Sequence, residues 1–280
     1  AAGIILIGSC SSGLASNVMV FIAKANLPLS VTVTAVSTLL APIMTPFMMK
    51  MLAGTYVHIE FLDMSMEIIK IVIVPIGAAL LYDAYLHSTE ILRKKLNTTF
   101  LISASWLIIM VIGLWSYLGT HLSANAMRFV ELVNFLFGAV VVGKLYFHAT
   151  KLLPRINGFM PQLSMFGIFY FTLVTTAASR EYILSVGMLV LLACIIHNTL
   201  GYTLGYWISR AVKLDEDSAR TVALEVGLQN GGMATGLAGV MGKLATVGLA
   251  AAIFSPWMNI SASLLANYWR KKKDKAEKNS

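Results

Sequence analysis

Apolar stretches of about the length of a membrane-spanning helix follow one another along almost the whole chain. A helix needs about 20 predominantly apolar residues to cross the hydrocarbon core of a bilayer. Applied along the sequence, this requirement predicts nine spans. They cover residues 1–24, 28–52, 64–86, 100–119, 129–150, 161–178, 182–209, 218–241 and 244–269. The stretch 129–150 contains Glu131 and Lys144, and an amphipathic helix at the membrane surface is its alternative interpretation.

Two of these stretches are interrupted by glycine and polar residues. The first interruption is predicted near residues 13–15, just before Ser16 and Asn17, and the second near 227–232, just after Glu225. A charged side chain at the bilayer centre costs roughly 2.5–3.5 kcal/mol unless it binds something. Interrupted helices in both halves of a membrane protein indicate the binding site of a secondary transporter. The pattern therefore favours an all-α polytopic membrane protein that moves an ion and a solute.

The distribution of basic residues predicts the orientation of the spans. With the C-terminus on the cytoplasmic side, 15 of the 21 Lys and Arg residues fall in cytoplasmic connections or the tail and 4 in outer connections, with the other two inside spans. Membrane proteins show this excess on the cytoplasmic side. The residues between 86 and 98, which include Arg93 to Lys95, are predicted to form one basic cytoplasmic connection. In this orientation the two interrupted spans run in opposite directions, as the halves of an inverted repeat do.

Composition supports a membrane protein and narrows its partners. The chain of 280 residues is 58% hydrophobic and 12% charged, whereas soluble domains have about 25% charged residues. The net charge of +8 does not indicate nucleic acid, because six basic residues lie in the tail after the last span. Cys10 and Cys194 lie in apolar stretches and are interpreted as packing residues. The chain opens inside a hydrophobic segment without a signal peptide, which predicts an N-terminally truncated sequence.

The polar residues around the interruptions are suited to a small cation. Glu225 is the acidic residue predicted to lie deep in a core span, and Gln229 and Asn230 follow it among glycines that loosen the helix. Ser30 and Thr34 share one helix face. Carboxylate, hydroxyl, amide and backbone oxygens together could form a shell for Na⁺. Two structural alternatives stay open: packing of small residues around the glycines, and bonding of the hydroxyls back to their own helix.

Other polar residues carry less information. His197 and Asn198 are interpreted as a helix–helix hydrogen bond in preference to a proton relay, and Asn259 and Ser261 either line a cavity or pack. The sequence contains no phosphate-binding loop, zinc-ligand spacing or nucleophile–base set, so we expect no enzyme activity and no organic cofactor.

Four stretches of this sequence resemble the bile acid:sodium symporter family, in order, spacing and residue type. They are Gly13-Leu14-Ala15-Ser16-Asn17-Val18-Met19, Leu29-Ser30-Val31-Thr32-Val33-Thr34-Ala35-Val36-Ser37-Thr38, Glu225-Val226-Gly227-Leu228-Gln229-Asn230 and Trp257-Met258-Asn259-Ile260-Ser261. The resemblance covers nearly the whole chain except an insertion around 87–160, and it implies that residues 100–150 add two helices.

The resemblance implies a fold of two inverted five-helix repeats, whose broken helices cross beside two sodium ions. It implies one transmembrane domain (1–280) with the first three helices missing, a core of 1–52 and 182–269, and a panel of 64–178. One sodium site would use Ser16, Asn17, Ser30, Thr34 and Glu225, and the second would use Glu225, Gln229 and the carbonyls of Val226 and Leu228. The substrate would border Gly13, Leu14, Ala15, Asn230 and Asn259.

The implied function is sodium-coupled uptake of a small organic anion by alternating access, with Na⁺ as the coupling ion. A bile-acid-like solute or a small carboxylate, such as a 2-oxo acid or pantoate, would be the cargo, and a bacterial plasma membrane the location. The missing helices remove a family glutamine of the second sodium site. Leu14 replaces a small hydroxyl residue of some relatives. Two alternatives stay open: an arsenite-type or other efflux carrier, which Cys10 could suggest, and a non-transporting receptor or scaffold.

Overall fold

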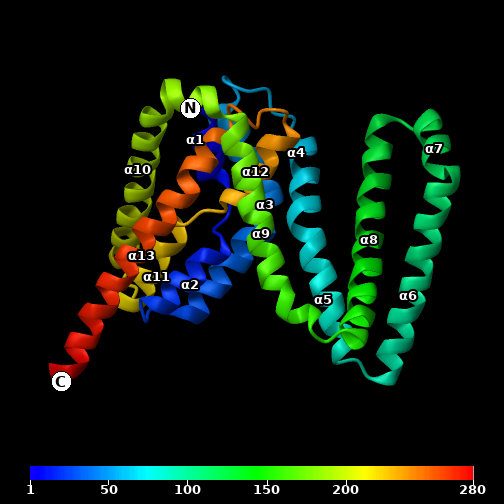
Figure 1. Ribbon diagram of the computed structural model, residues 1–280, viewed down its shortest axis with the longest axis horizontal. Helices are drawn as coiled ribbons and strands as arrows, with labels where there is room; N and C mark the ends of the chain where they lie inside the picture. Colours follow the sequence, from blue (N-terminus) through cyan, green and yellow to red (C-terminus); the bar gives the residue numbers. More distant parts are fainter. Residues whose placement is uncertain (280) are drawn as a thin grey trace. The chain divides into compact units, whose positions relative to one another are not determined.

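The computed structural model describes residues 1–279, and the chain divides into two compact units. Unit 1 consists of residues 1–65 and 169–280, and unit 2 of residues 66–168. Figure 1 shows the helices in chain order. Unit 1 holds α1 (Ala2–Ser9), α2 (Leu14–Ile22), α3 (Leu27–Ala53), α10 (Arg180–Ala211), α11 (Glu216–Gly227), α12 (Gly231–Val240) and α13 (Gly248–Asn279). Unit 2 holds the helices α5 (Val74–Leu86), α6 (Glu90–Ile109), α7 (Trp115–His121) and α8 (Ala124–Leu152) and the π-helical segments η1 (Ile69–Ile73) and η2 (Met110–Leu114). Two further helices, α4 (Phe61–Ile68) and α9 (Ile156–Ala178), each have residues in both units.

Seven helical stretches of the described residues are long and apolar enough to cross a membrane. They are Leu27–Ala53, Phe61–Leu86, Glu90–His121, Ala124–Leu152, Ile156–Ala178, Arg180–Ala211 and Gly248–Lys275. Each corresponds to one predicted uninterrupted span, and the two interrupted spans are the helix pairs α1–α2 and α11–α12. The prediction of an all-α polytopic membrane protein is confirmed.

Both interruptions begin at other residues than predicted, and only the second is shorter than predicted. The first comprises residues 10–13, so the prediction of a break at 13–15 was wrong, because Leu14 and Ala15 already form the first turn of α2. Gly13 is the extended residue before that turn, with φ −109° and ψ 163°. The second comprises residues 228–230 instead of 227–232. It ends early because the Asn230 side chain accepts a hydrogen bond from the Met233 amide (2.9 Å) and caps α12.

The predicted basic connection between residues 86 and 98 is also mostly helical. Only residues 87–89 connect α5 to α6, which begins at Glu90. Thr89 caps α6 by accepting a hydrogen bond from the Leu92 amide (3.4 Å), and Glu90 places a negative charge in the first turn. Arg93 to Lys95 follow, and arginine and lysine are good helix formers. The charged run that was predicted to be a loop is therefore part of α6.

Polar partners within unit 2 explain how charged residues lie in its long apolar helices. The Lys70 Nζ atom donates to Glu67 and to Glu131, each at 2.6 Å. Lys144 donates to Asn97 (2.8 Å), and its Nζ atom lies 4.2 Å from the centre of the Phe100 ring. The charges of α8 are thus compensated by neighbouring helices, as expected of charges in membrane helices. This fits residues 129–150 as part of one spanning-length helix better than as a surface helix.

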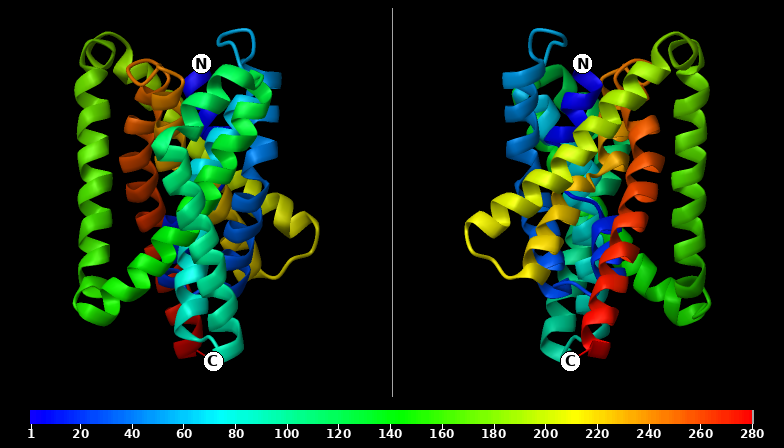
Figure 2. Two further views of the ribbon diagram at one scale, coloured as in Figure 1. Left: turned by 90° about the vertical axis from the view of Figure 1, so that its right-hand side faces the viewer. Right: turned by 90° about the vertical axis from the view of Figure 1, so that its left-hand side faces the viewer.

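Glycine residues let α10 and α11 pack very closely as an antiparallel hairpin, which Figures 1 and 2 show. A Cβ atom added to Gly205 would lie 3.0 Å from the Ala223 Cα atom, and one added to Gly201 would lie 3.2 Å from the Gly227 Cα atom. Small residues at such contacts allow two backbones to approach in a membrane. The second interrupted segment is therefore held directly against a continuous helix.

The start of α11 is fixed by Asp215, which accepts hydrogen bonds from the Ser218 hydroxyl (2.6 Å) and the Ser218 amide (2.9 Å). These bonds lower the pKa of the Asp215 carboxyl below its usual value. A carboxyl whose pKa is depressed by folding stabilises the protein above its unfolded-state pKa of about 3.9, and this contribution is lost as the pH falls through the folded-state pKa.

We therefore expect Asp215→Asn, which keeps a capping oxygen but removes the charge, to lower the melting temperature near pH 6. The difference from the unaltered chain should begin to shrink as the pH falls below about 4 and should continue to shrink toward the lower pKa of the folded state. Thermal unfolding in detergent between pH 6 and pH 3 measures both. A difference that stays constant over this range would contradict the capping role of the charge.

Candidate functional site

The two interruptions cross each other and are joined by backbone hydrogen bonds. The Gly13 amide donates to the Leu228 carbonyl (3.2 Å), and the Asn230 amide donates to the Ser11 carbonyl (2.8 Å). Ser12 and Gln229 form an antiparallel bridge between these bonds. The crossing satisfies backbone groups that would otherwise be unpaired inside a membrane.

Gly13 faces the second interruption at this crossing. A Cβ atom at this position would lie 3.4 Å from the Gln229 carbonyl oxygen and 3.5 Å from the Asn230 Cα atom, which are ordinary contact distances. The backbones of the two interruptions therefore lie in direct contact here.

The carboxylate of Glu225 lies beside this crossing and is almost entirely buried, with 3% of the residue exposed. Ser30 on α3 donates to its Oε1 atom (2.5 Å), and Thr34 donates to its Oε2 atom (2.9 Å). Both hydroxyls thus point across to α11 instead of bonding back to their own helix. The prediction that the Ser30–Thr34 face meets Glu225 agrees with this geometry.

The first broken helix adds the remaining oxygen atoms of this cluster. The Asn17 Oδ1 atom accepts hydrogen bonds from Ser30 (2.7 Å) and Thr34 (3.3 Å). The Ser16 hydroxyl donates to the Gly13 carbonyl (2.8 Å) and lies 3.5 Å from the Thr34 hydroxyl. All five residues predicted for one sodium site are therefore brought together by the consecutive helices α2 and α3 and by α11, which lies about 190 residues further along the chain.

The charge of Glu225 has no basic partner among the described residues. Its two hydrogen-bond donors are neutral hydroxyls, and each has a single proton for the two acceptors within its reach. Removing a carboxylate from water costs several kcal/mol unless an opposite charge compensates it. The cluster is thus rich in oxygen atoms and carries one negative charge, which is the donor set that a small hard cation takes.

The residues predicted for a second sodium site have other partners in the structure. The Leu228 carbonyl accepts the amide of Gly13 (3.2 Å), and the Gln229 Oε1 atom lies 2.8 Å from the His197 Nε2 atom on α10. The Asn230 amide, which would extend α11 by donating to Val226, turns to Ser11. This leaves the Val226 carbonyl without the donor that a continuous helix would supply.

Four of the residues predicted to border a solute (Gly13, Leu14, Ala15 and Asn230) lie at the starts of the half-helices α2 and α12, whereas Asn259 lies within α13. Leu14 at the start of α2 is 80% exposed, and Ala15 is half-buried. Asn230 caps α12, and Asn259 on α13 is exposed and donates to the Ser255 carbonyl (2.8 Å). Helix N-termini carry partial positive charge, so this region favours an anion.

Two residues of α10 form hydrogen bonds to the second interruption and the residue before it. Asn198 is buried and donates to the Gly227 carbonyl (2.8 Å), while its Oδ1 atom accepts the Ser261 hydroxyl (2.6 Å). The neighbouring His197 holds Gln229. The interpretation of His197 and Asn198 as a helix–helix contact agrees with the structure, and it extends to positioning the unwound segment.

Ser12 and Asn26 are polar contributors that the sequence analysis did not single out. The Ser12 hydroxyl lies 3.5 Å from the Thr34 hydroxyl and 3.2 Å from that of Ser37, so it extends the hydroxyl cluster. Asn26 precedes Pro28, and this order of residues is typical of a helix start. The capping signal could have identified Asn26, but its long-range partners could not have been found from the sequence.

Asn26 connects α3 to α11 one helical turn away from the carboxylate. Its side chain accepts from the Leu29 amide (3.1 Å) and donates to Ser218 (3.1 Å), and its amide donates to the Thr221 hydroxyl (2.9 Å). Four residues further along each helix, Ser30 meets Glu225. Asn26 therefore sets the register in which the hydroxyls face the carboxylate.

If the oxygen cluster takes Na⁺, replacing Asn26 by alanine should weaken that binding about threefold to tenfold, because loss of the cap and of the register contact costs about 1 kcal/mol. Sodium titration of the purified protein measures this change. Ser123→Ala is a matched control, since Ser123 caps α8 by accepting from the Ala126 amide (3.4 Å) in unit 2. Equal sodium affinity in both variants would contradict the register role.

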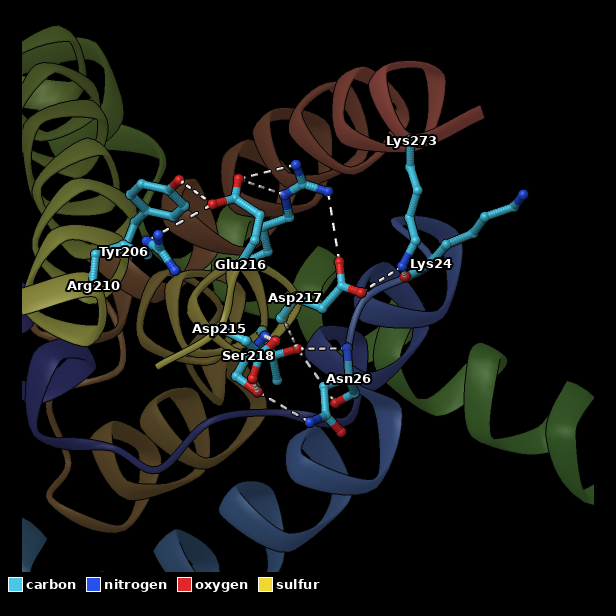
Figure 3. Close-up of polar contacts among 11 residues, drawn as sticks. Lys24, Asn26, Tyr206, Arg210, Asp215, Glu216, Asp217, Ser218 and Lys273 are labelled. Carbon is cyan, nitrogen blue, oxygen red and sulfur yellow. Dashed lines mark hydrogen bonds and ion pairs between the residues drawn. The ribbon is translucent and has the colours of Figure 1, made fainter. Parts of the chain in front are cut away.

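A second polar cluster lies at the ends of α10 and α13 and the start of α11, and Figure 3 shows its contacts. Lys273 donates to Asp217 (2.5 Å) and to the Lys24 carbonyl (2.9 Å). Arg220 pairs with Glu216 (3.0 Å), which also accepts the Tyr206 hydroxyl (2.8 Å). This cluster joins the turn after α2 to α11 and to the tail.

Together, the crossing and the buried oxygen cluster define an integral membrane protein of the class with two discontinuous helices. The sequence model described as the sodium bile acid symporter family matches residues 1–125. An uncharacterized sodium-dependent transporter of Bacillus subtilis, YocS, is 31% identical over 281 aligned residues, which include the whole chain and 67% of the relative. The chain belongs to the sodium bile acid symporter family.

Plant relatives extend this similarity. The probable sodium/metabolite cotransporter BASS1 of Arabidopsis thaliana chloroplasts is 27% identical over 97% of the chain, and its rice counterpart is 26% identical over 96%. The chain spans about half the length of these plant proteins, 52% and 51% respectively. These relatives are named as transporters and not as enzymes.

Proposed function

We propose that this chain forms the sodium- and solute-binding part of a symporter that takes up a small organic anion. The observation that carries the proposal is the buried carboxylate of Glu225, which lies among hydroxyl and amide oxygens without a basic partner in the described residues. Na⁺ bound there would neutralise the charge and satisfy the oxygens together. The names of the relatives, a sodium-dependent transporter and sodium/metabolite cotransporters, support the same coupling ion.

The second ion of the proposed mechanism would use the unwound segment after Glu225. The carbonyls of Val226 and Leu228 and the side chain of Gln229 supply further oxygens beside the shared carboxylate. For this ion to bind, Gln229 would turn its oxygen from His197 toward the metal. The two sites would then be linked through one carboxylate, so that filling the first organises the second.

The solute would bind next to the crossing, against Gly13 to Ala15, Asn230 and Asn259. Two half-helix N-termini at this place favour a carboxylate or another anionic group. Each net positive charge that moves inward contributes about 2.3 kcal/mol per 100 mV of membrane potential, which suffices to concentrate such a solute. Alternating access would follow from movement of the ion-binding helices relative to the others.

The test is solute flux into proteoliposomes under an imposed sodium gradient, with the protein supplied with any further helices of its natural sequence. A bile acid, a 2-oxo acid and pantoate are compared as cargo, and potassium replaces sodium as control. Uptake that requires the sodium gradient supports the proposal. Sodium-independent arsenite efflux would favour the carrier alternative, and sodium-dependent solute binding without flux would favour a receptor.

A further inference from the structure

A cavity of about 320 Å³ lies between the C-terminal ends of α10 and α13 within unit 1. Aromatic side chains make most of its wall, and one acidic and one basic residue stand at its polar end. The residues that matter here are Tyr206, Trp207, Glu216, Tyr268, Trp269 and Lys272. None of them belongs to the proposed ion or solute site.

The sequence places this groove at the level of lipid headgroups. On α13, Tyr268 and Trp269 end the apolar stretch and basic residues 270–273 follow immediately. On α10, Tyr206 and Trp207 likewise precede Arg210. Tyrosine and tryptophan concentrate where hydrocarbon meets water, and basic residues concentrate just beyond. The Tyr206 and Trp269 rings stack with centres 6.2 Å apart, so both helices reach this level together.

The charges around the groove leave one ammonium group free. Glu216 accepts hydrogen bonds from Tyr206 (2.8 Å) and Arg220 (3.0 Å), and the Arg210 Nε atom lies 3.8 Å away. The acid of the groove is therefore already compensated, as Figure 3 shows. Lys272, in contrast, is exposed and has no ion pair with any described residue.

We propose that this groove binds the headgroup of an anionic phospholipid. The Lys272 ammonium meets the phosphate, and the aromatic wall of Trp207 and Trp269 takes the glycerol and upper acyl chain. Inorganic phosphate would satisfy the lysine but leave the aromatic wall without a ligand, which is why the geometry favours a lipid. A basic residue near a membrane surface contributes about 1 kcal/mol to the binding of acidic lipid, or about fivefold in affinity.

The test uses quenching of tryptophan fluorescence by brominated lipids. Replacing Trp106, Trp115 and Trp257 by phenylalanine leaves only the two tryptophans of the groove. In vesicles of phosphatidylcholine, brominated phosphatidylglycerol should quench them more strongly than the same fraction of brominated phosphatidylcholine. Lys272→Gln should lower this preference about fivefold, whereas Lys272→Arg should keep it and the matched control Lys271→Gln should change it less than twofold.

Three outcomes overturn the proposal. Equal quenching by both brominated lipids would show that the groove does not select a headgroup. If Lys271→Gln and Lys272→Gln reduce the preference for phosphatidylglycerol equally, the lipid is attracted by the whole basic tail and not by the groove. Displacement of the brominated lipid by millimolar inorganic phosphate means an anion site and not a lipid site. Spin-labelled phosphatidylglycerol, observed by electron paramagnetic resonance with all five tryptophans present, must rank the Lys271 and Lys272 variants in the same order, so the result does not depend on the tryptophan substitutions.

Discussion

Replacement of Glu225 by glutamine should abolish sodium-dependent uptake and weaken sodium binding roughly 1,000-fold. Glutamine keeps the size of the side chain and can still accept the Ser30 and Thr34 hydroxyls, so the main loss is the charge. A unit charge at about 4 Å contributes about 4 kcal/mol at an effective dielectric constant of about 20. Each 1.4 kcal/mol corresponds to a factor of ten in affinity.

Stability gives a second readout for the same variant. A cation that binds only the folded protein raises its melting temperature. Sodium chloride should therefore stabilise the unaltered chain more than potassium chloride does, and Glu225→Gln should lose this difference. Without sodium, the variant should be as stable as the unaltered chain or more stable, because an unpaired buried charge has been removed.

Glu181→Gln provides the matched control, since Glu181 is exposed at the start of α10 and carries the same charge. Its sodium affinity should equal that of the unaltered chain. Retention of sodium-dependent uptake by Glu225→Gln would refute the role of the carboxylate, even if the protein proved to be a sodium-driven transporter through other groups.

The oxygen cluster could be predicted because its members follow simple local rules. Ser30 and Thr34 share a face through the helical repeat, and Glu225 stands out as a carboxylate in an apolar stretch. Their meeting across about 190 residues was inferred from the two opposed interrupted spans, and the resemblance to a family then assigned the individual ligands. The structure then supplied the atoms: which hydroxyl meets which carboxylate oxygen, and that Asn17 accepts from both hydroxyls.

Element boundaries were less predictable because long-range contacts decide them. The first interruption begins at Cys10, since the backbones of Ser11 and Gly13 bond to the second broken helix. The run Ser11-Ser12-Gly13 is a local turn signal, but it does not by itself fix where α1 ends. The start of α6 at Glu90 shows the opposite error: polarity indicated a loop, although Thr89 and Glu90 form a good helix start.

The tail-side contacts also depend on tertiary structure. The basic tail reads as an orientation signal, yet Lys273 pairs specifically with Asp217 at the start of α11. The same helix ends at the crossing, and its Glu225 lies between these two points. Consequently α11 is held at its first turn by the tail, at its middle by α3, and at its end by α10. The proposed cation ligand is thus part of a helix that is fixed along its whole length.

Replacing Gly227 by alanine should destabilise the protein by about 1–2 kcal/mol and reduce sodium-dependent uptake at least tenfold. Alanine is the better helix former by up to about 1 kcal/mol, so propensity alone predicts stabilisation. The packing reverses the sign, because the added Cβ atom would lie 2.1 Å from the Tyr202 Cε1 atom and 2.2 Å from its Cδ1 atom. Overpacking of this kind costs typically 1–3 kcal/mol. The ring would have to move, which would disturb the bond between Asn198 and the Gly227 carbonyl.

Gly232→Ala separates this steric effect from a general sensitivity of the glycine-rich segment. Its added Cβ atom would lie 3.5 Å from the nearest atom, the Asn230 Oδ1 atom, which is ordinary contact. We expect it to be neutral or slightly stabilising. Combining Gly227→Ala with Tyr202→Ala should cost less than the sum of the two single changes, because the shortened side chain removes the clash. Melting temperatures of the unaltered chain, the two single variants (Gly227→Ala and Tyr202→Ala) and the double variant measure this coupling. Strictly additive values would mean that Gly227 is required for backbone freedom and not for the close approach of α10, and the proposed clash between an alanine side chain and the Tyr202 ring would then be refuted.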